Sequence, residues 1–83
     1  IDGVLDLLAG DDAVSGGSRR NRDYAATFTT FAPGVEEARR RLACDATTSG
    51  GLLVAVAPAA AASLPGPIVG EIVAGEPGAI AVR

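Results

Sequence analysis

A continuous apolar run, Leu52 to Ala57, limits the folds that are open to this chain. Its sequence, LLVAVA, shows no alternation of apolar and polar residues, so it predicts a β-strand that is covered on both faces. Gly50 and Gly51 precede the run and Pro58 ends it. Such a strand belongs inside a sheet with further structure on either side, because a half-exposed strand would carry a polar residue at every second position.

Helical segments are predicted on both sides of a long polar stretch. Apolar residues at helical spacing predict the end of a helix over residues 2–8, and Gly10 is its expected stop. Residues 10–21 are expected to form a long polar loop. Residues 35–42 predict a second helix, because acidic residues precede arginines in the order that the helix dipole favours. The pairs Glu36–Arg40 and Glu37–Arg41 should stabilise it.

The remaining segments are shorter. Residues 22–31 predict a short turn of helix followed by an extended segment, and residues 59–63 allow a turn or two of helix. Strands are expected over residues 68–73 and 79–82, joined at residues 74–78 as an antiparallel hairpin. The parallel crossover across residues 58–67 would be short for its usual helix.

Helices and strands therefore interleave, which predicts an α/β or α+β sandwich-like domain with helices packed on a mixed sheet. The length of 83 residues fits a single domain or a piece of one. Because the chain starts at Ile1 with the tail of a helix, we expect residues 1–83 to be one domain of a larger protein.

The composition excludes several functions. All seven basic residues are arginine, so no histidine or lysine can act as a general base or form a Schiff base. A net charge of −3 argues against non-specific nucleic-acid binding. Cys44 alone cannot form an internal disulfide, which is consistent with a reducing cytoplasm, and one cysteine without histidine makes no zinc site. Proline and glutamate interrupt the apolar residues after Gly51, so no membrane span is expected.

Two motifs combine a glycine pair with hydroxyl side chains: GGSRRN at residues 16–21 and DATTSGGLL at residues 45–53. Glycine lets a ligand approach backbone N–H groups, which can form an anion-binding nest, and arginine suits phosphate. The motifs therefore predict two walls of one anionic site. The alternative is that each glycine pair is a tight turn or cap.

In this order the two motifs resemble those of the C-terminal domain of selenophosphate synthetase (selenide, water dikinase). Members of that family carry Gly-Gly-Thr-x-x-Asn and, further on, Asp-Pro-Gln-Thr-Ser-Gly-Gly-Leu-Leu before a core strand. Here Ser18 replaces the threonine of the first motif, and Ala46 and Thr47 replace the proline and glutamine of the second.

The resemblance implies the C-terminal half of an aminoimidazole ribonucleotide synthetase-type fold. It implies a parent enzyme that uses ATP, Mg²⁺, selenide and water to make selenophosphate, AMP and phosphate. The partner domain would be the N-terminal domain of the same enzyme, which binds ATP and Mg²⁺, carries the catalytic residues and forms a homodimer. This chain is then expected to be inactive alone, without catalytic residues, metal ligands, nucleic-acid partners or membrane partners.

The candidate phosphate-binding residues are those of the two motifs: Gly16, Gly17, Ser18, Arg20, Asn21, Asp45, Thr48, Ser49, Gly50 and Gly51. Two alternatives remain open, a free-standing anion-binding module and a domain that only packs against a partner. Exposed apolar surface is expected where a partner domain packs, and it would favour self-association.

Overall fold

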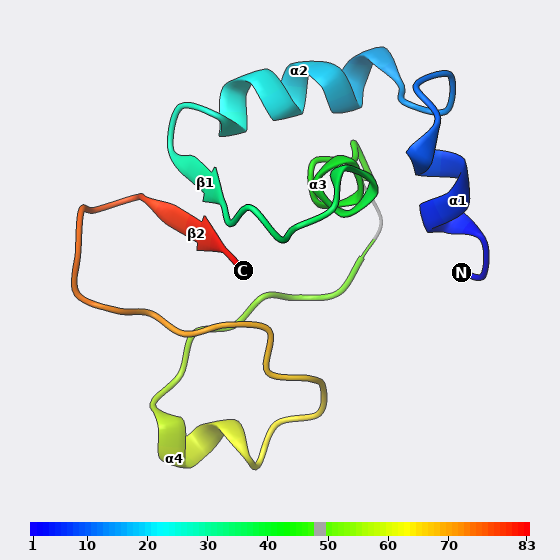
Figure 1. Cartoon of the computed structure of the whole chain (residues 1–83). Coiled ribbons are helices and arrows are strands. Elements are labelled where there is room, and N and C mark those ends of the chain that lie inside the picture. The colour runs from blue at the N-terminus through cyan, green and yellow to red at the C-terminus, as the bar shows by residue number, and fades with distance from the viewer. Residues whose placement is uncertain (48–49) are drawn as a thin grey trace.

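The computed structural model describes residues 1–47 and 50–83, and Figure 1 traces the chain through them. Helices and strands alternate irregularly along the described residues. In chain order they are α1 (Val4–Ala9), α2 (Gly16–Ala25), β1 (Thr29–Phe31), α3 (Glu37–Ala43), α4 (Pro58–Ala61) and β2 (Ile80–Val82).

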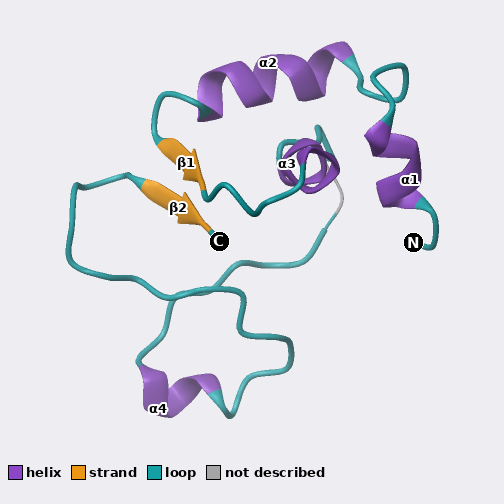
Figure 2. Cartoon of the chain, in the orientation of Figure 1, coloured by secondary structure: helices purple, strands orange, loops and turns teal. Residues whose placement is uncertain are grey.

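The first three helices form one cluster. Helix α1 packs against α3, and α2 runs across the same group in Figure 2. Leu8 of α1 and Cys44, which caps the C-terminal end of α3, are the buried apolar residues of the described chain, each 8% exposed. Ser18 on α2 is the buried polar residue at 3%. The centre of this cluster is therefore small and partly polar.

Strands β1 and β2 pair in parallel although they lie far apart in the sequence. Thr29 faces Ile80 and Phe31 faces Val82. The pairing continues past the strand ends, because the Ile80 amide donates to the Phe28 carbonyl at 2.8 Å and the Ala32 amide donates to the Val82 carbonyl at 2.8 Å. This two-stranded sheet joins the end of the chain to the helical cluster.

Several local predictions are confirmed. Helix α1 occupies the predicted first segment and Gly10 is its C-cap. Helix α3 coincides with the predicted charged helix within two residues, and the expected Glu37–Arg41 ion pair forms at 3.3 Å. The expected Glu36–Arg40 pair is not formed among the described residues, because Arg40 donates to the carbonyls of Val35 and Ala32 instead. The segment at residues 22–31 is helical and then extended, as expected, and α4 makes the short helix after Pro58.

The predicted polar loop over residues 10–21 is wrong in its second half, because α2 begins at Gly16. The Ser15 side chain accepts a hydrogen bond from the Ser18 amide at 3.1 Å, which is the ordinary contact of a helix N-cap. The first glycine motif is thus the opening turn of a helix.

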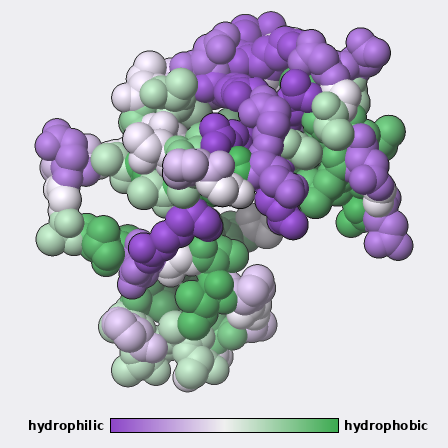
Figure 3. All heavy atoms as spheres, viewed as in Figure 1, coloured by the Kyte–Doolittle hydropathy of each residue, from purple (hydrophilic) through white to green (hydrophobic). Residues whose placement is uncertain are grey.

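The strands predicted at residues 52–57 and 68–73 are absent from the described chain, and so is the antiparallel hairpin. Strand β2 pairs in parallel with β1 instead. The apolar run lacks the cover on which its prediction depended: Leu52 is 95% exposed and Leu53 is 87% exposed. In the space-filling view, strongly apolar atoms are visible in the lower part of the molecule (Figure 3). The larger mixed sheet of the sandwich-like domain stays a prediction.

Candidate anion-binding site

The first motif is positioned by the N-terminal cap of α2. Ser15 has extended backbone angles and its hydroxyl accepts from the Ser18 amide. A second contact of 2.9 Å joins the hydroxyl oxygens of Ser15 and Ser18. Because Ser18 sits in the first helical turn, the cap turns its side chain toward the interior of the helical cluster, where it is 3% exposed.

Ser18 connects the two motifs directly. Its hydroxyl donates to Asp45 Oδ1 at 2.6 Å, across 27 residues of sequence. The amide of Ala46 donates back to the Ser18 oxygen at 3.3 Å. The start of the second motif is therefore bound to the first turn of α2. That the two motifs form two walls of one anionic site stays a prediction.

The same junction explains one of the glycines. A Cβ atom added to Gly17 would lie 3.1 Å from the Cβ of Ala46, closer than most such contacts in proteins. A larger side chain at Gly17 would push the second motif away from the helix. No comparable crowding occurs at Gly50 or Gly51, where an added Cβ would meet nothing within 4 Å.

Asp45 carries a negative charge at the junction. Its hydrogen bond from Ser18, and then the one from the Thr47 hydroxyl at 2.7 Å, hold the pKa of the Asp45 carboxyl below its usual range. Hydrogen bonds to the charged form favour ionisation. An incoming oxyanion would be repelled at this point, so any anion must bind beside Asp45 or displace it.

A pocket of about 300 Å³ opens next to Ser18, between α2 and the C-terminal end of α3. Three arginines and two aspartates give it its charged lining. The lining residues are Asp11, Val14, Ser18, Arg19, Arg22, Asp23, Arg41 and Cys44. Ser18 of the first motif therefore lines the pocket, and so does Cys44, the residue that precedes the second motif.

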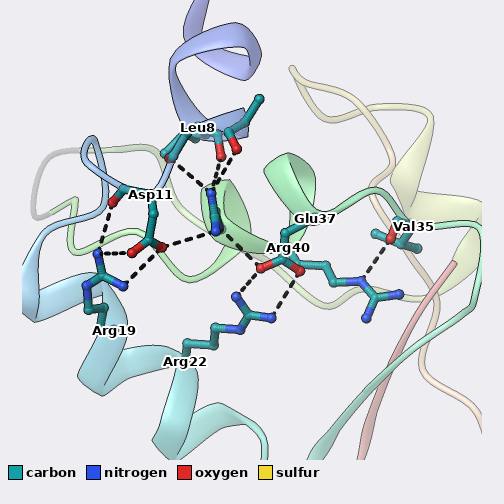
Figure 4. Close-up of polar contacts among 10 residues, drawn as sticks. Leu8, Asp11, Arg19, Arg22, Val35, Glu37 and Arg40 are labelled. Atoms are coloured by element: carbon teal, nitrogen blue, oxygen red, sulfur yellow. Dashed lines mark hydrogen bonds and ion pairs between the residues drawn. The ribbon is translucent and has the colours of Figure 1, made fainter.

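The pocket arginines are held by carboxylates of the chain itself (Figure 4). Arg19 donates to both carboxylate oxygens of Asp11, at 3.1 and 2.9 Å. Arg22 forms a two-bond contact with Glu37, the second bond measuring 3.0 Å. These contacts lower the pKa of Asp11, mainly through the Arg19 hydrogen bond, and that of Glu37, mainly through the Arg22 hydrogen bond.

Arg41 is the most buried of the three pocket arginines, with a side chain that is 14% exposed. It donates to the carbonyls of Leu8 at 2.8 Å and Gly10 at 2.9 Å, and it pairs with Asp11 at 3.1 Å. Arg41 thus satisfies the carbonyl end of α1 from α3. These contacts give it a structural role, and an anion would have to compete with them.

The pocket arginines Arg19, Arg22 and Arg41 were not predicted as a group. Arg19 and Arg22 are three residues apart, so they share a face of α2, and Arg41 follows Glu37 by one helical turn. That spacing was visible in the sequence. The unpredicted part was that α2 begins at Gly16, which places the two arginines on one helix.

The predicted site residues are only partly brought together. Gly17, Ser18 and Asp45 meet at the junction, and Gly16 lies in the same helical turn. Arg20 and Asn21 lie exposed on α2, and Gly50 and Gly51 lie exposed beyond the junction. Thr48 and Ser49 are outside the described residues. The pocket lining does not include either glycine pair.

Among residues 1–47 and 50–83, no three acidic, cysteine or histidine side chains gather closely enough to hold a metal ion. None of the helices in this part of the chain has the length and apolar character needed to cross a lipid bilayer.

Comparison with known proteins finds similarity to selenide, water dikinases. Over 49 residues, 59% of its length, the chain is 46% identical to the selenide, water dikinase of Aliarcobacter butzleri (strain RM4018). Over 45 residues, 54% of its length, it is 47% identical to that of Pelobacter propionicus (strain DSM 2379 / NBRC 103807 / OttBd1). The matches span only 14% and 13% of those relatives. No protein-family model and no solved structure matches the chain.

These similarities confirm the resemblance that the two motifs indicated. The chain is similar in sequence to these two selenide, water dikinases over more than half of its own length.

Proposed function

We propose that this chain contributes a phosphate-binding wall to a selenophosphate synthetase, an enzyme that converts ATP, selenide and water to selenophosphate, AMP and phosphate in the cytoplasm. The sequence similarity to two enzymes of that name supports the choice of reaction. ATP and Mg²⁺ would be held mainly by a separate N-terminal domain, with which this chain packs in a homodimeric parent. The chain alone is then without activity.

The observation that carries the proposal is the junction of Ser18 with Asp45 and Ala46. It fixes the start of the second motif beside the first turn of α2, and the proposal requires the backbone N–H groups of both motifs to face the same anion. Phosphoryl transfer depends mostly on positioning and charge stabilisation. A scaffold that orients backbone donors therefore suits such an enzyme without supplying a catalytic residue.

Each candidate has a role in the proposal. Ser18 and Asp45 hold the scaffold, since their hydrogen bonds are to each other. Arg20 is exposed on α2 and provides the positive charge, with Asn21 next to it. The N–H groups of Gly16, Gly17, Gly50 and Gly51, with the hydroxyls of Thr48 and Ser49, complete the proposed set of anion donors. Magnesium receives no ligands from this set, because it lacks a group of carboxylates.

One observation favours a second candidate, a domain that only packs against a partner. Arg19, Arg22 and Arg41 are paired with carboxylates inside the chain. The negative charge of Asp45 lies at the junction itself. In that case the glycines serve only as turns and close contacts, and neither motif binds phosphate.

Amide NMR of the chain during titration with sodium phosphate separates the two candidates, with sodium chloride at equal ionic strength as the control. Phosphate binding should shift the amides of Gly16, Gly17, Gly50 and Gly51 together. The Arg20→Ala variant should weaken this response several-fold. Arg39→Ala, which removes an exposed arginine of α3, should leave it unchanged. Silent amides would favour the packing domain.

An activity assay completes the test. The chain mixed with ATP, Mg²⁺ and selenide should form no AMP above the background of the buffer. Turnover by the chain alone would contradict the proposed division of labour, because it would require a catalytic residue within these 83 residues.

A further inference from the structure

Two arginines from different helices converge on one exposed carboxylate. Arg19 of α2 donates to both carboxylate oxygens of Asp11, at 3.1 and 2.9 Å, and Arg41 of α3 donates to Asp11 Oδ1 at 3.1 Å. Figure 4 shows the Asp11 carboxylate next to the Arg19 guanidinium. Three guanidinium nitrogens that point at one pair of oxygens form the arrangement by which arginines bind phosphate as well as carboxylate.

We propose that Arg19 and Arg41 form a binding site for inorganic phosphate in the charged pocket, and that Asp11 is a built-in competitor whose carboxylate the phosphate displaces. The inference is independent of the phosphate-binding wall proposed above, because neither arginine is assigned to that wall. It adds a second anion site to the chain, together with the side chain that controls access to it.

The Asp11 carboxylate can leave the arginines without disturbing the fold. Its side chain is 64% exposed and lies on the connection between α1 and α2. Exposed ion pairs contribute little to stability because water screens them. Rotation of the side chain leaves the backbone contacts of Asp11 in place, since its carbonyl accepts from Arg19 at 2.9 Å and from the Val14 amide at 3.1 Å.

Both arginines would keep their positions after the carboxylate leaves. The three carbonyls at the end of α1 hold Arg41 Nη1 at 2.8 to 3.2 Å, whereas its contact with Asp11 uses Nη2. Arg19 keeps its bond to the Asp11 carbonyl. A phosphate ion would therefore compete with one side chain only, and it would meet donors that are already placed, which removes the cost of ordering them.

The charge and size of the pocket favour phosphate over another carboxylate. A phosphate dianion carries twice the charge of the Asp11 carboxylate, so its attraction to two arginines is stronger. Glu37 is occupied by Arg22 and Arg41, and Asp23 is the other carboxylate in the lining. The volume of about 300 Å³ lies at the small end of ligand pockets, which suits a small ion.

Calorimetric titration of the chain with sodium phosphate tests the proposal, with sodium chloride at equal ionic strength as the control. Asp11→Ala should bind phosphate roughly tenfold more tightly than the parent, because the apparent affinity of a site scales with the fraction of molecules in which it is open. Adding Arg19→Ala to this variant should abolish the gain. Circular dichroism checks the helices, and Asp11→Asn, which removes only the charge, gives the same test if Asp11→Ala unfolds.

Asp23→Ala is the matched control, because it removes one negative charge from the same pocket. In the described chain the ion-pair partners of Arg19 and Arg41 are Asp11 and Glu37, so this variant releases neither arginine. Its gain in phosphate affinity should stay below about threefold, as expected for the loss of one exposed charge.

Arg20→Ala separates this proposal from the proposed function. It removes the arginine of the phosphate-binding wall and should leave the gain of Asp11→Ala unchanged. Equal gains in Asp11→Ala and Asp23→Ala, or no gain in Asp11→Ala, would overturn the inference. Neither of those results would bear on the response of the glycine amides.

Discussion

At the scale of single residues, Ser18 is the side chain that connects the two glycine motifs. It lies in the first turn of α2, it is buried, and its hydroxyl holds the second motif by two hydrogen bonds. The resemblance to selenophosphate synthetases indicated a phosphate ligand at this position. In the structure Ser18 joins the two motifs through its hydrogen bond to Asp45. The sequence could not predict this contact, because no local pattern relates residues 27 positions apart.

Replacing Ser18 by alanine should therefore lower the free energy of unfolding by about 1 kcal/mol, because a part-buried hydrogen bond to the exposed Asp45 carboxylate is lost. Ser18→Thr retains the hydroxyl and should recover most of the loss. Ser63→Ala, at an exposed serine, should have no measurable effect. Urea unfolding followed by circular dichroism measures all three. Equal stability of Ser18→Ala and the parent would show that the junction contributes nothing.

The carboxylates predict how stability depends on pH. The pKa of Asp45 is lowered by hydrogen bonds from Ser18 and Thr47, while those of Asp11 and Glu37 are lowered chiefly by their arginine hydrogen bonds. Unfolded Asp and Glu titrate near pH 3.9 and 4.3, roughly. The stabilisation is thus complete above these values and is lost as pH falls through the lower folded-state pKa values.

Chain stability should therefore be constant near neutral pH and decline below about pH 4. Asp45→Asn should reduce the steepness of that decline, and Asp2→Asn, at a residue outside these contacts, should not. NMR titration of the Asp45 side chain provides the direct measurement. A carboxyl that titrates at or above its ordinary value would show that the two hydroxyl contacts do not persist in solution.

At the scale of the elements, local sequence signals were sufficient where one residue fixes a boundary. Gly10 ends α1, the order of acids and arginines predicts α3, and Pro58 begins α4. Ser15, the N-cap of α2, is an equally local signal, but the two glycines that follow it predict a loop. Local signals could not predict how the helices pack together, because the contacts between the helices come from side chains of distant segments.

Arg41 shows this coupling most directly. Three carbonyls at the end of α1 accept from its guanidinium, and Asp11 and Glu37 pair with it. Arg41→Ala should lower the free energy of unfolding by about 2 kcal/mol, since hydrogen bonds involving a charged group in a half-buried place are lost. Arg39→Ala, on the exposed side of the same helix, should stay within about 0.5 kcal/mol of the parent.

Thermal and urea unfolding of the two variants give the comparison. Arg41→Lys keeps the charge but lacks the planar group of donors, so it should recover only part of the stability. If Arg41→Ala and Arg39→Ala were equivalent, the contact between α1 and α3 would have to depend on apolar packing alone.

At the scale of the whole molecule, the two halves of the chain differ in how well their structure could be predicted from the sequence. The first half contains the charged helices and their contacts, and most of its elements could be predicted. The apolar run of residues 52–57 predicted a strand covered on both faces, but the described chain has no layer that covers it. Its sequence is typical of a buried strand, and no described element of these 83 residues buries it.

The only β-pairing in the described chain joins these halves across about fifty residues of sequence, from Thr29 to Ile80. Closing a loop of that length has an entropic cost that three residue pairs must offset. The pairing of β2 should therefore open more easily than the helical cluster, which has its own contacts between α1 and α3.

Ile80→Pro tests this order of stability, because proline removes the amide that donates to the Phe28 carbonyl. Amides 81 and 82 should lose protection from hydrogen exchange, while the helical circular dichroism signal and the protection within α2 and α3 remain. Ile80→Ala keeps the amide and, at a side chain that is 50% exposed, should retain the pairing. Loss of the helices together with β2 in the proline variant would mean that the sheet and the helical cluster fold as one cooperative unit.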